Sequence, residues 1–308
     1  MRCQFEEKEY EQPLDYELGK HNVWSPGQVF ENKVGFDAAI ISNNPQFWKL
    51  WQTRGISLGR QGIQLNWQIW EMVEERWKSK TFPKLKFNLF VQHKVPHYIY
   101  KKHGSEYHYW NRPYFRYDLK DHQQEALDKL EKKVSSDGMV VYACPSFYKR
   151  KDLYRLMRGK LILNSNFVQP HSLKGHTRYT FIRGGKGGKA CSEAEKIEGV
   201  NILDEFGRMF ERFTEFENNV VFVNKLAEKV RTVIKELESA DRENYFILER
   251  NIGLPEHEFG RSIMTTLIFA YFINTTWRIG YVINREPNSI YRETKNGRLE
   301  GFLKSLKE

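Results

Sequence analysis

The chain has 308 residues, of which 40% are hydrophobic and 15% aromatic, and it carries a formal net charge of +10 at a pI near 9.3. This length and apolar content suffice for a buried core and exclude an intrinsically disordered chain. The excess of lysine and arginine suits a polyanionic partner such as nucleic acid, and ordinary basic solubility is the alternative.

The N-terminal segment and the cysteines indicate a cytoplasmic protein. Residues 1–8 contain no apolar stretch of the kind that signal peptides have. The three cysteines are isolated and lack the spacing of a zinc site or a disulfide framework. The longest uncharged stretch, Ser262 to Trp277, is too short and too polar for a membrane span, so we expect a buried helix and no membrane contact.

Two short β-prone runs carry the residues of greatest chemical interest. The first, 35–41, contains Asp37, and the second, 85–94, ends in Gln92 and Lys94. Apolar residues occupy every second position of the second run from its start. Alternate side chains of a strand point to the same face, so the two polar side chains at its end project together while the apolar set faces the core.

A tryptophan-rich segment separates these two runs. Positions 66 to 79 fit an amphipathic helix, and core packing is the expected role of its tryptophans rather than base stacking. Because Asp37 and Gln92 are 55 positions apart, we expect a helical insertion at about 45–80 between two strands that pair with each other. The predicted buried stripe consists of Trp70, Val73 and Trp77.

A helix and a third strand follow. Asp121 is predicted to cap a helix that ends near Val134, with Gln124 completing a capping box. The apolar run 138–143 fits a strand that is covered on both faces. Strand, helix and strand in this order predict a βαβ crossover and a mixed α/β fold.

Two basic segments are candidates for contacts with nucleic acid. The first is a loop after residue 94, rich in histidine and tyrosine, whose cations could bind phosphates; an aromatic loop packed on its own domain is the alternative. Its histidines lack the ligand spacing of a zinc site. The second is the run 149–160, for which a solvated helix face is the alternative. The candidate DNA-binding residues are Lys101, Lys102, Arg112, Lys149, Arg150, Lys151 and Arg155.

A glycine-rich loop precedes a change to helical character. Residues 183–189 lack the spacing of a P-loop, which leaves both phosphate contact and a flexible connection open. From about residue 193 the pattern is helical, and two apolar stripes and the apolar segment 263–283 predict an oligomerisation or partner-binding domain, with intrachain core as the alternative. The stripes are Phe206, Phe210, Phe213 and Phe216, and Leu226, Val230, Val233 and Leu237.

The polar residues of the two β-prone runs suit a magnesium site. Asp37 would supply a carboxylate, Gln92 its amide oxygen and His93 its backbone carbonyl. Because a glutamine brings no negative charge, Glu31 is the acid expected to compensate. Lys94 could hold the attacking water or stabilise charge on the phosphoryl oxygens, while the ion lowers the pKa of its water. These roles predict hydrolysis of a phosphodiester.

The constellation of Glu31, Asp37, Gln92 and Lys94 resembles the PD-(D/E)xK nuclease superfamily in its Q-x-K variant. The resemblance covers roughly residues 20 to 185. The surrounding segments look like the effector nucleases of bacterial antiphage systems, namely CBASS effectors and the nuclease subunit of Lamassu-type, SMC-associated systems. They are Tyr109–Arg116, His122–Gln124 and Val141–Phe147.

This resemblance implies a restriction-endonuclease-like mixed sheet flanked by helices over residues 1–190, and the helical pattern after it predicts an α-helical domain over 191–308. It implies a DNA endonuclease of little sequence specificity that uses Mg²⁺, or Mn²⁺ as the alternative ion, on double-stranded DNA. The short helical C-terminal portion favours the Lamassu-type system, which implies an SMC-like ATPase and an accessory subunit as partners. Self-association is expected through the C-terminal helices.

Two rival functions stay open from the sequence. The neutral Gln92 also fits a non-catalytic nucleic-acid-binding or scaffolding subunit of a defence complex. A sequence-specific type II restriction endonuclease is the weaker alternative.

Overall fold

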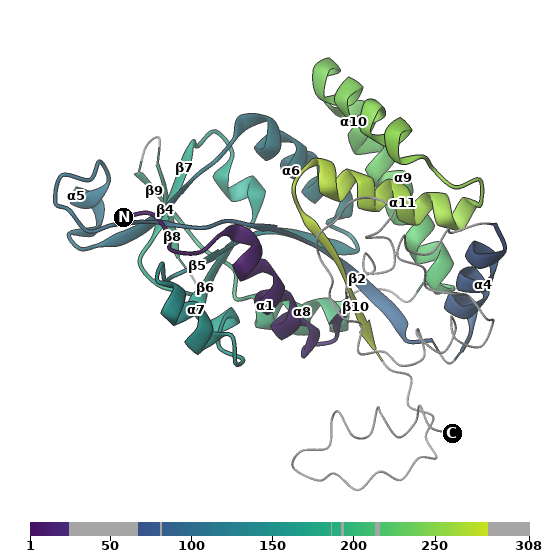
Figure 1. Ribbon diagram of the computed structural model, residues 1–308, viewed down its shortest axis with the longest axis horizontal. Helices are drawn as coiled ribbons and strands as arrows, with labels where there is room; N and C mark the ends of the chain where they lie inside the picture. The colour runs from purple at the N-terminus through teal and green to yellow at the C-terminus, as the bar shows by residue number, and fades with distance from the viewer. Residues whose placement is uncertain (25–66, 81, 186, 192–193, 213–215, 283–308) are drawn as a thin grey trace, which may run out of the picture.

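Two five-stranded sheets form the framework of the described residues (Figure 1). The structure is a computed structural model, and it describes residues 1–24, 67–80, 82–185, 187–191, 194–212 and 216–282. Within these ranges the fold is mixed α/β, as the sequence predicts, with a largely helical region toward the C-terminus.

The first sheet is mixed, and β2 lies at its centre. This strand pairs antiparallel with β10 on one edge and parallel with β5 on the other. The parallel pair is joined through helix α6, so the predicted βαβ crossover is confirmed. In spatial order the strands are β1 (Val23–Trp24), β10 (Thr276–Val282), β2 (Lys84–His93), β5 (Gly138–Pro145) and β6 (Ser165–Val168).

Helices cover both faces of the first sheet, as Figure 1 shows, so β2 is buried on both sides. One face lies under α1 (Glu7–Gly19), α7 (Arg150–Leu156) and α8 (Ile202–Arg212). The opposite face lies under α4 (Trp67–Lys78), α6 (Asp121–Val134), α9 (Asn219–Glu236) and α11 (Glu258–Phe272).

The strict alternation predicted for the second β-prone run is wrong at its start. Phe87, Leu89 and Val91 belong to the core under α1, whereas Leu85 belongs to the core on the other face. The register between β2 and β10 shifts between Gly280 and Tyr281. Such a bulge inserts one extra residue and moves the preceding side chain to the opposite face.

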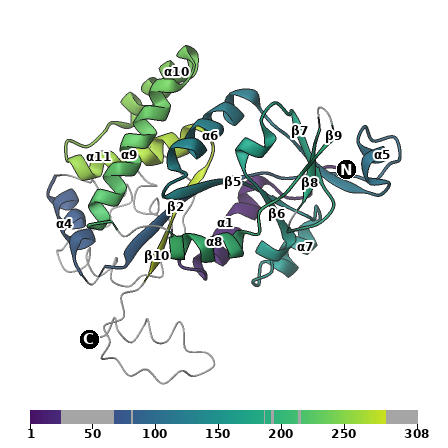
Figure 2. The ribbon, with the colours of Figure 1, turned by 180° about the vertical axis from the view of Figure 1, so that it is seen from behind.

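The second sheet is antiparallel throughout and extends away from the helices α9 and α11 (Figure 2). Helix α5 (Tyr107–Trp110) lies between β3 and β4, at the end of the molecule opposite α4. The spatial order is β3 (His97–Ile99), β4 (Tyr114–Asp118), β7 (Arg178–Phe181), β8 (Gly188–Cys191) and β9 (Ala194–Ile197). Two 3-10 helices, η2 (Ile162–Asn164) and η3 (Pro170–Leu173), flank β6.

The helices α4 and α6 confirm two sequence predictions and correct a third. Trp70, Val73 and Trp77 are buried on one stripe of α4. Helix α6 has the predicted bounds, but its N-cap residue is Lys120, and no side chain caps it. The predicted capping box is wrong because the Gln124 side chain is engaged elsewhere: its amide donates to the carbonyl of Pro170 and accepts from the hydroxyl of Tyr142.

The C-terminal portion is built into the same framework. The stripe of Leu226, Val230, Val233 and Leu237 is intrachain core. The segment predicted over 263–283 divides into the buried helix α11 and strand β10, which lies between β1 and β2. The first sheet therefore crosses the predicted boundary at residues 190 and 191. Helix α10 (Ser239–Ile252) projects from the rest, with Tyr245 as its buried residue.

The phenylalanine stripe predicted over 206–216 is wrong as a single helix face. Helix α8 ends at Arg212. Phe206 and Phe210 pack against Phe87 under one face of the sheet. Phe216 instead contacts Phe222 in the core on the opposite face. The chain thus changes faces between these residues; Phe213 lies outside the described residues.

The close approach of β10 to a ring of β2 makes Gly280 a sensitive position. A Cβ built there would lie 2.2 Å from the Phe87 ring. We expect Gly280→Ala to lower the free energy of unfolding by about 1–3 kcal/mol, because the buried ring must shift to admit a methyl group. Thermal or urea unfolding measures this. Gly207→Ala on the exposed side of α8, where nothing lies within 4 Å, is the matched control and should be neutral or slightly stabilising.

Candidate functional site

Gln92 and Lys94 lie at the carboxyl end of β2, on the face that carries α6. Gln92 pairs with Tyr142 of β5 and is fully buried. Neither its amide nitrogen nor its amide oxygen has a hydrogen-bond partner in the described part of the chain. Buried amides are rarely left in this state, since an unsatisfied group costs about 1–3 kcal/mol. Both amide atoms of Gln92 are therefore available to bind a ligand or a further polar group.

The Lys94 ammonium is held by helix α6. Its Nζ donates to the side-chain oxygen of Gln123 over 3.1 Å and lies 5.8 Å from the ring centroid of Tyr142. Gln123 in turn donates to the carbonyl of Ile273 over 2.9 Å. Burial lowers the pKa of Lys94, and the carboxylate of Glu7 partly opposes this. A lysine in this environment releases its proton more readily than one in water.

The two predicted carboxylates, Glu31 and Asp37, lie outside the described residues. The strand that ends in Gln92 has β10 on one edge over residues 84–91 and β5 on the other over residues 88–93. The expected pairing of the run 35–41 with this strand falls on residues that the structure does not describe, so it stays a prediction.

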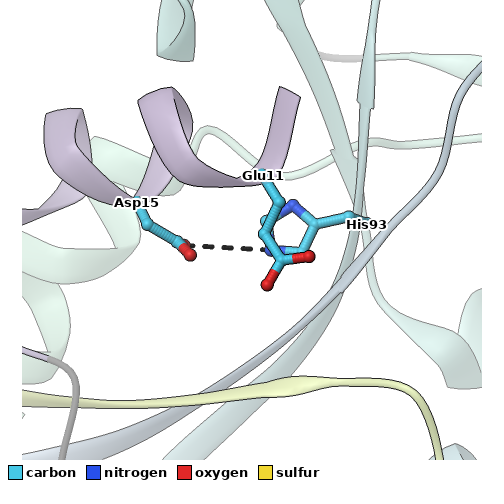
Figure 3. A group of neighbouring side chains, drawn as sticks. All are labelled: Glu11, Asp15 and His93. Atoms are coloured by element: carbon cyan, nitrogen blue, oxygen red, sulfur yellow. Dashed lines mark ion pairs between the residues drawn. The ribbon is translucent and has the colours of Figure 1, made fainter. Parts of the chain in front are cut away.

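The neighbouring residue His93 points to the opposite face, and there the structure brings together residues that sequence reasoning missed. Its backbone carbonyl stays a predicted metal ligand. Its side chain meets Glu11 and Asp15 of α1 in a buried cluster (Figure 3). Arg278 of β10 pairs with Asp15 there. The sequence carries one signal for this cluster: Glu11 and Asp15 are four residues apart, and each directly follows a residue of an apolar helical stripe. This spacing puts both acids on the edge of a buried face.

Cations of the predicted DNA-binding loop lie on the surface of the β3–β4 connection. Lys101, Lys102 and Arg112 are all exposed. The loop is held from beneath by the buried Glu106, which accepts from the Tyr114 hydroxyl over 2.7 Å and from Arg178 over 2.9 Å. The cations are therefore displayed on a structured hairpin.

The second predicted basic segment forms α7. Leu153 and Leu156 face the core, and Lys151 is exposed. Two of its arginines are already paired: Arg150 with Glu9 at 3.0 Å and Arg155 with Asp152 at 3.1 Å. Lys149 lies 5.5 Å from the ring centroid of Tyr148. A polyanion would have to compete with these carboxylates on α7, whereas no carboxylate in the described ranges is paired with Lys101, Lys102 or Arg112.

The glycine-rich loop connects β7 and β8 and is attached to β6. The Gly185 amide donates to the carbonyl of Ser165 over 2.9 Å, and the Asn166 side chain donates to the carbonyls of Gly185 and Gly187. Both glycines have positive φ, near 80° and 98°, a conformation that strongly favours glycine. These contacts support a connecting role.

No protein-family model, curated protein or solved structure matches this chain. Within the described ranges, every helix is too short or too polar to cross a lipid bilayer. The chemistry of the site therefore has to be argued from its own residues.

The Glu106 network gives the loop a defined pH dependence. Burial alone would raise the pKa of Glu106, but hydrogen bonds from Tyr114, Ser105 and Arg178 outweigh it and lower the pKa from 4.5 to about 2. A depressed pKa means that the stabilisation is complete above about pH 4.5 and is lost as the pH falls toward 2. We expect Glu106→Gln to lower the melting temperature at pH 7, and this difference from the wild type to shrink below pH 4.5.

Melting curves between pH 2.5 and 7 check this expectation. Glu125→Gln on the exposed side of α6 is the matched control and should show a small difference at every pH. A Glu106→Gln difference that stays constant across the range would mean that the carboxylate charge has no part in holding the loop.

Proposed function

We propose that this protein is a metal-dependent endonuclease acting on double-stranded DNA, with its site at the carboxyl end of β2. The observation that carries the proposal is the pair formed by the unsatisfied amide of Gln92 and the partly desolvated ammonium of Lys94 on one strand face. A buried amide oxygen without a donor suits a hard cation. A cationic donor beside it suits a phosphoryl group.

Each residue of the proposed site would have its own role in phosphodiester hydrolysis. Gln92 would offer an oxygen ligand, with the carboxylates of Asp37 and Glu31 as the predicted negative charges. A bound Mg²⁺ would polarise the scissile phosphate and acidify a water molecule. Lys94, held by Gln123, would position that water or donate a hydrogen bond to a phosphoryl oxygen. A fixed Gln123 keeps the flexible lysine in one place, which favours a preorganised site.

One observation favours a second candidate, a non-catalytic nucleic-acid-binding subunit. Strands β10 and β5 lie along the two edges of β2, and the side-chain amide of Gln92 accepts no hydrogen bond from any described residue. If neither Asp37 nor Glu31 reaches this point, the site has no metal ligand of negative charge. The exposed cations of the loop would then remain as the functional surface.

The wider role rests on the family resemblance. It favours an effector of an antiphage defence complex that degrades DNA with little sequence preference, assembled with an SMC-like ATPase and an accessory subunit. In such a complex the nuclease subunit is restrained or positioned by its partners, which would make the isolated chain weakly active.

Cleavage of plasmid DNA with Mg²⁺ or Mn²⁺ tests the enzyme directly. We expect Asp37→Ala and Lys94→Ala each to reduce cleavage at least about 100-fold, because each removes a group that acts on the transition state. Lys132→Ala, which removes an exposed lysine of α6, should leave the rate unchanged.

The assay should be run with the isolated chain and with co-expressed neighbouring gene products. The enzyme proposal is wrong if neither preparation cuts DNA while both bind it, and that pattern would establish the binding subunit. A ladder of discrete fragments in place of general degradation would indicate a sequence-specific restriction enzyme.

Salt dependence of DNA binding separates the two basic surfaces. Phosphate contacts release counterions, so each lost contact reduces the slope of log K against log salt by about 0.9. We expect the triple variant Lys101→Ala, Lys102→Ala and Arg112→Ala to reduce the slope by about 2 to 3. The α7 variant Arg150→Ala and Arg155→Ala should have a smaller effect, since both arginines are ion-paired.

A matched triple variant carries Lys132→Ala, Lys235→Ala and Arg250→Ala, which are exposed cations of α6, α9 and α10. It controls for loss of net charge. Equal slopes for the two triple variants would show that DNA responds to overall charge and that the loop is no specific contact surface.

A further inference from the structure

A second polar cluster lies on the other face of β2, one residue from Gln92. Glu11 and Asp15 of α1 and His93 of β2 are each at least 95% buried. Their ligand atoms all lie within 4.8 Å of one another. Figure 3 shows the two carboxyl groups and the imidazole turned toward a common point between α1 and the strand.

The charges of this cluster do not balance within the core. Two carboxylates are buried, and Arg278 is the buried cation, paired with Oδ2 of Asp15. Lys8 reaches Oε2 of Glu11 at 3.3 Å, but its own side chain is 61% exposed. A buried carboxylate without full compensation is costly, because its charge has lost its water.

The hydrogen bonding of the cluster is incomplete at the same place. Oε1 of Glu11, Oδ1 of Asp15 and Nδ1 of His93 have no hydrogen-bond partner within the described chain. The other ring nitrogen, Nε2 of His93, lies 3.2 Å from the Thr276 hydroxyl and 3.8 Å from Oδ1 of Asp15. Two carboxylate oxygens with unused lone pairs therefore lie beside the His93 ring, whose Nε2 would have to exchange the Thr276 hydroxyl for an ion.

We propose that Glu11, Asp15 and His93 form a binding site for a divalent transition-metal ion, with Zn²⁺ and Mn²⁺ as the ions of matching chemistry. Two carboxylates and an imidazole are a mixed oxygen and nitrogen set, which suits these ions better than Mg²⁺. The ion would occupy the unpartnered carboxylate oxygens and offset the excess negative charge. Arg278 would keep its pair with Asp15 and orient that carboxylate from behind.

The observed spacing is close to what coordination requires. Bonds of about 2.1 Å place neighbouring tetrahedral ligands roughly 3.4 Å apart. The distance of 3.8 Å between Oδ1 of Asp15 and Nε2 of His93 is close to this value. Glu11, with a longer side chain, would need to move by on the order of 1 Å to complete the set.

The metal would have a structural role. It would join α1 to the end of β2, and so fix the strand on the side opposite Gln92 and Lys94. The three ligands are too deeply buried to meet a DNA substrate. The inference is independent of the nuclease proposal, since it uses a different face and different residues.

Metal binding by tag-free, EDTA-treated protein tests the inference. The Asp37→Ala variant is the preferred background, because it removes the predicted magnesium ligand. Titration with ZnCl₂ followed by calorimetry, and with MnCl₂ followed by loss of the free Mn²⁺ EPR signal, should each show one tightly bound equivalent. Saturating metal should raise the melting temperature by about 5 °C, because the ion binds the folded state.

Glu11→Gln is the decisive variant, since it preserves side-chain volume and leaves the Asp15–Arg278 pair intact. It should weaken metal binding at least 10-fold and abolish the thermal shift, while circular dichroism confirms that it is folded. Glu9→Gln, a carboxylate on the exposed side of the same helix, should bind metal like the parent. Failure of the parent to bind one equivalent, or equal affinity in Glu11→Gln, would overturn the site and leave a buried ion-pair network without a metal.

Discussion

Strand β2 is buried on both faces and hydrogen-bonded on both edges, and the rest of the described fold depends on this double constraint. Its edges are taken by β10, from the C-terminal portion, and by β5, from the crossover. Its faces are covered by α1 and α8 on one side and by α6, α9 and α11 on the other. Sequence-distant segments are thereby joined in one sheet, and every residue of the strand from Phe87 to His93 is buried.

This burial gives the polar end of β2 its significance. A strand inside two apolar layers carries polar side chains at a cost unless they are satisfied. Gln92 and His93 alternate at this end, so one faces α6 and the other α1. Further polar groups lie on each side: Lys94 and Gln123 on the first, and Glu11, Asp15 and Arg278 on the second. The two proposed sites would thus share a single strand end.

The cations of the two basic surfaces differ in their ion pairing. The net charge of the chain is positive, but some of its exposed cations are paired with carboxylates and others are not paired with any described carboxylate. On α7, Arg150 and Arg155 are ion-paired with Glu9 and Asp152. On the β3–β4 connection, Glu106 is buried below the surface and secures Tyr114 and Arg178, while Lys101, Lys102 and Arg112 stay exposed. The cations of the two surfaces thus differ in their local ion pairing among the described residues.

The sequence by itself determined what depends on local periodicity: the stripe of Trp70, Val73 and Trp77, the bounds of α6, the doubly covered β5 and the stripe on α9 were all predictable. Tertiary structure alone decided the rest. The bulge that turns Leu85, the use of Gln124 away from the cap, and the pairing of β10 with β2 arise between segments far apart in the chain. The same holds for the Glu11, Asp15 and His93 cluster, because side-chain periodicity specifies which face a residue occupies and carries no information about which distant segment that face will meet.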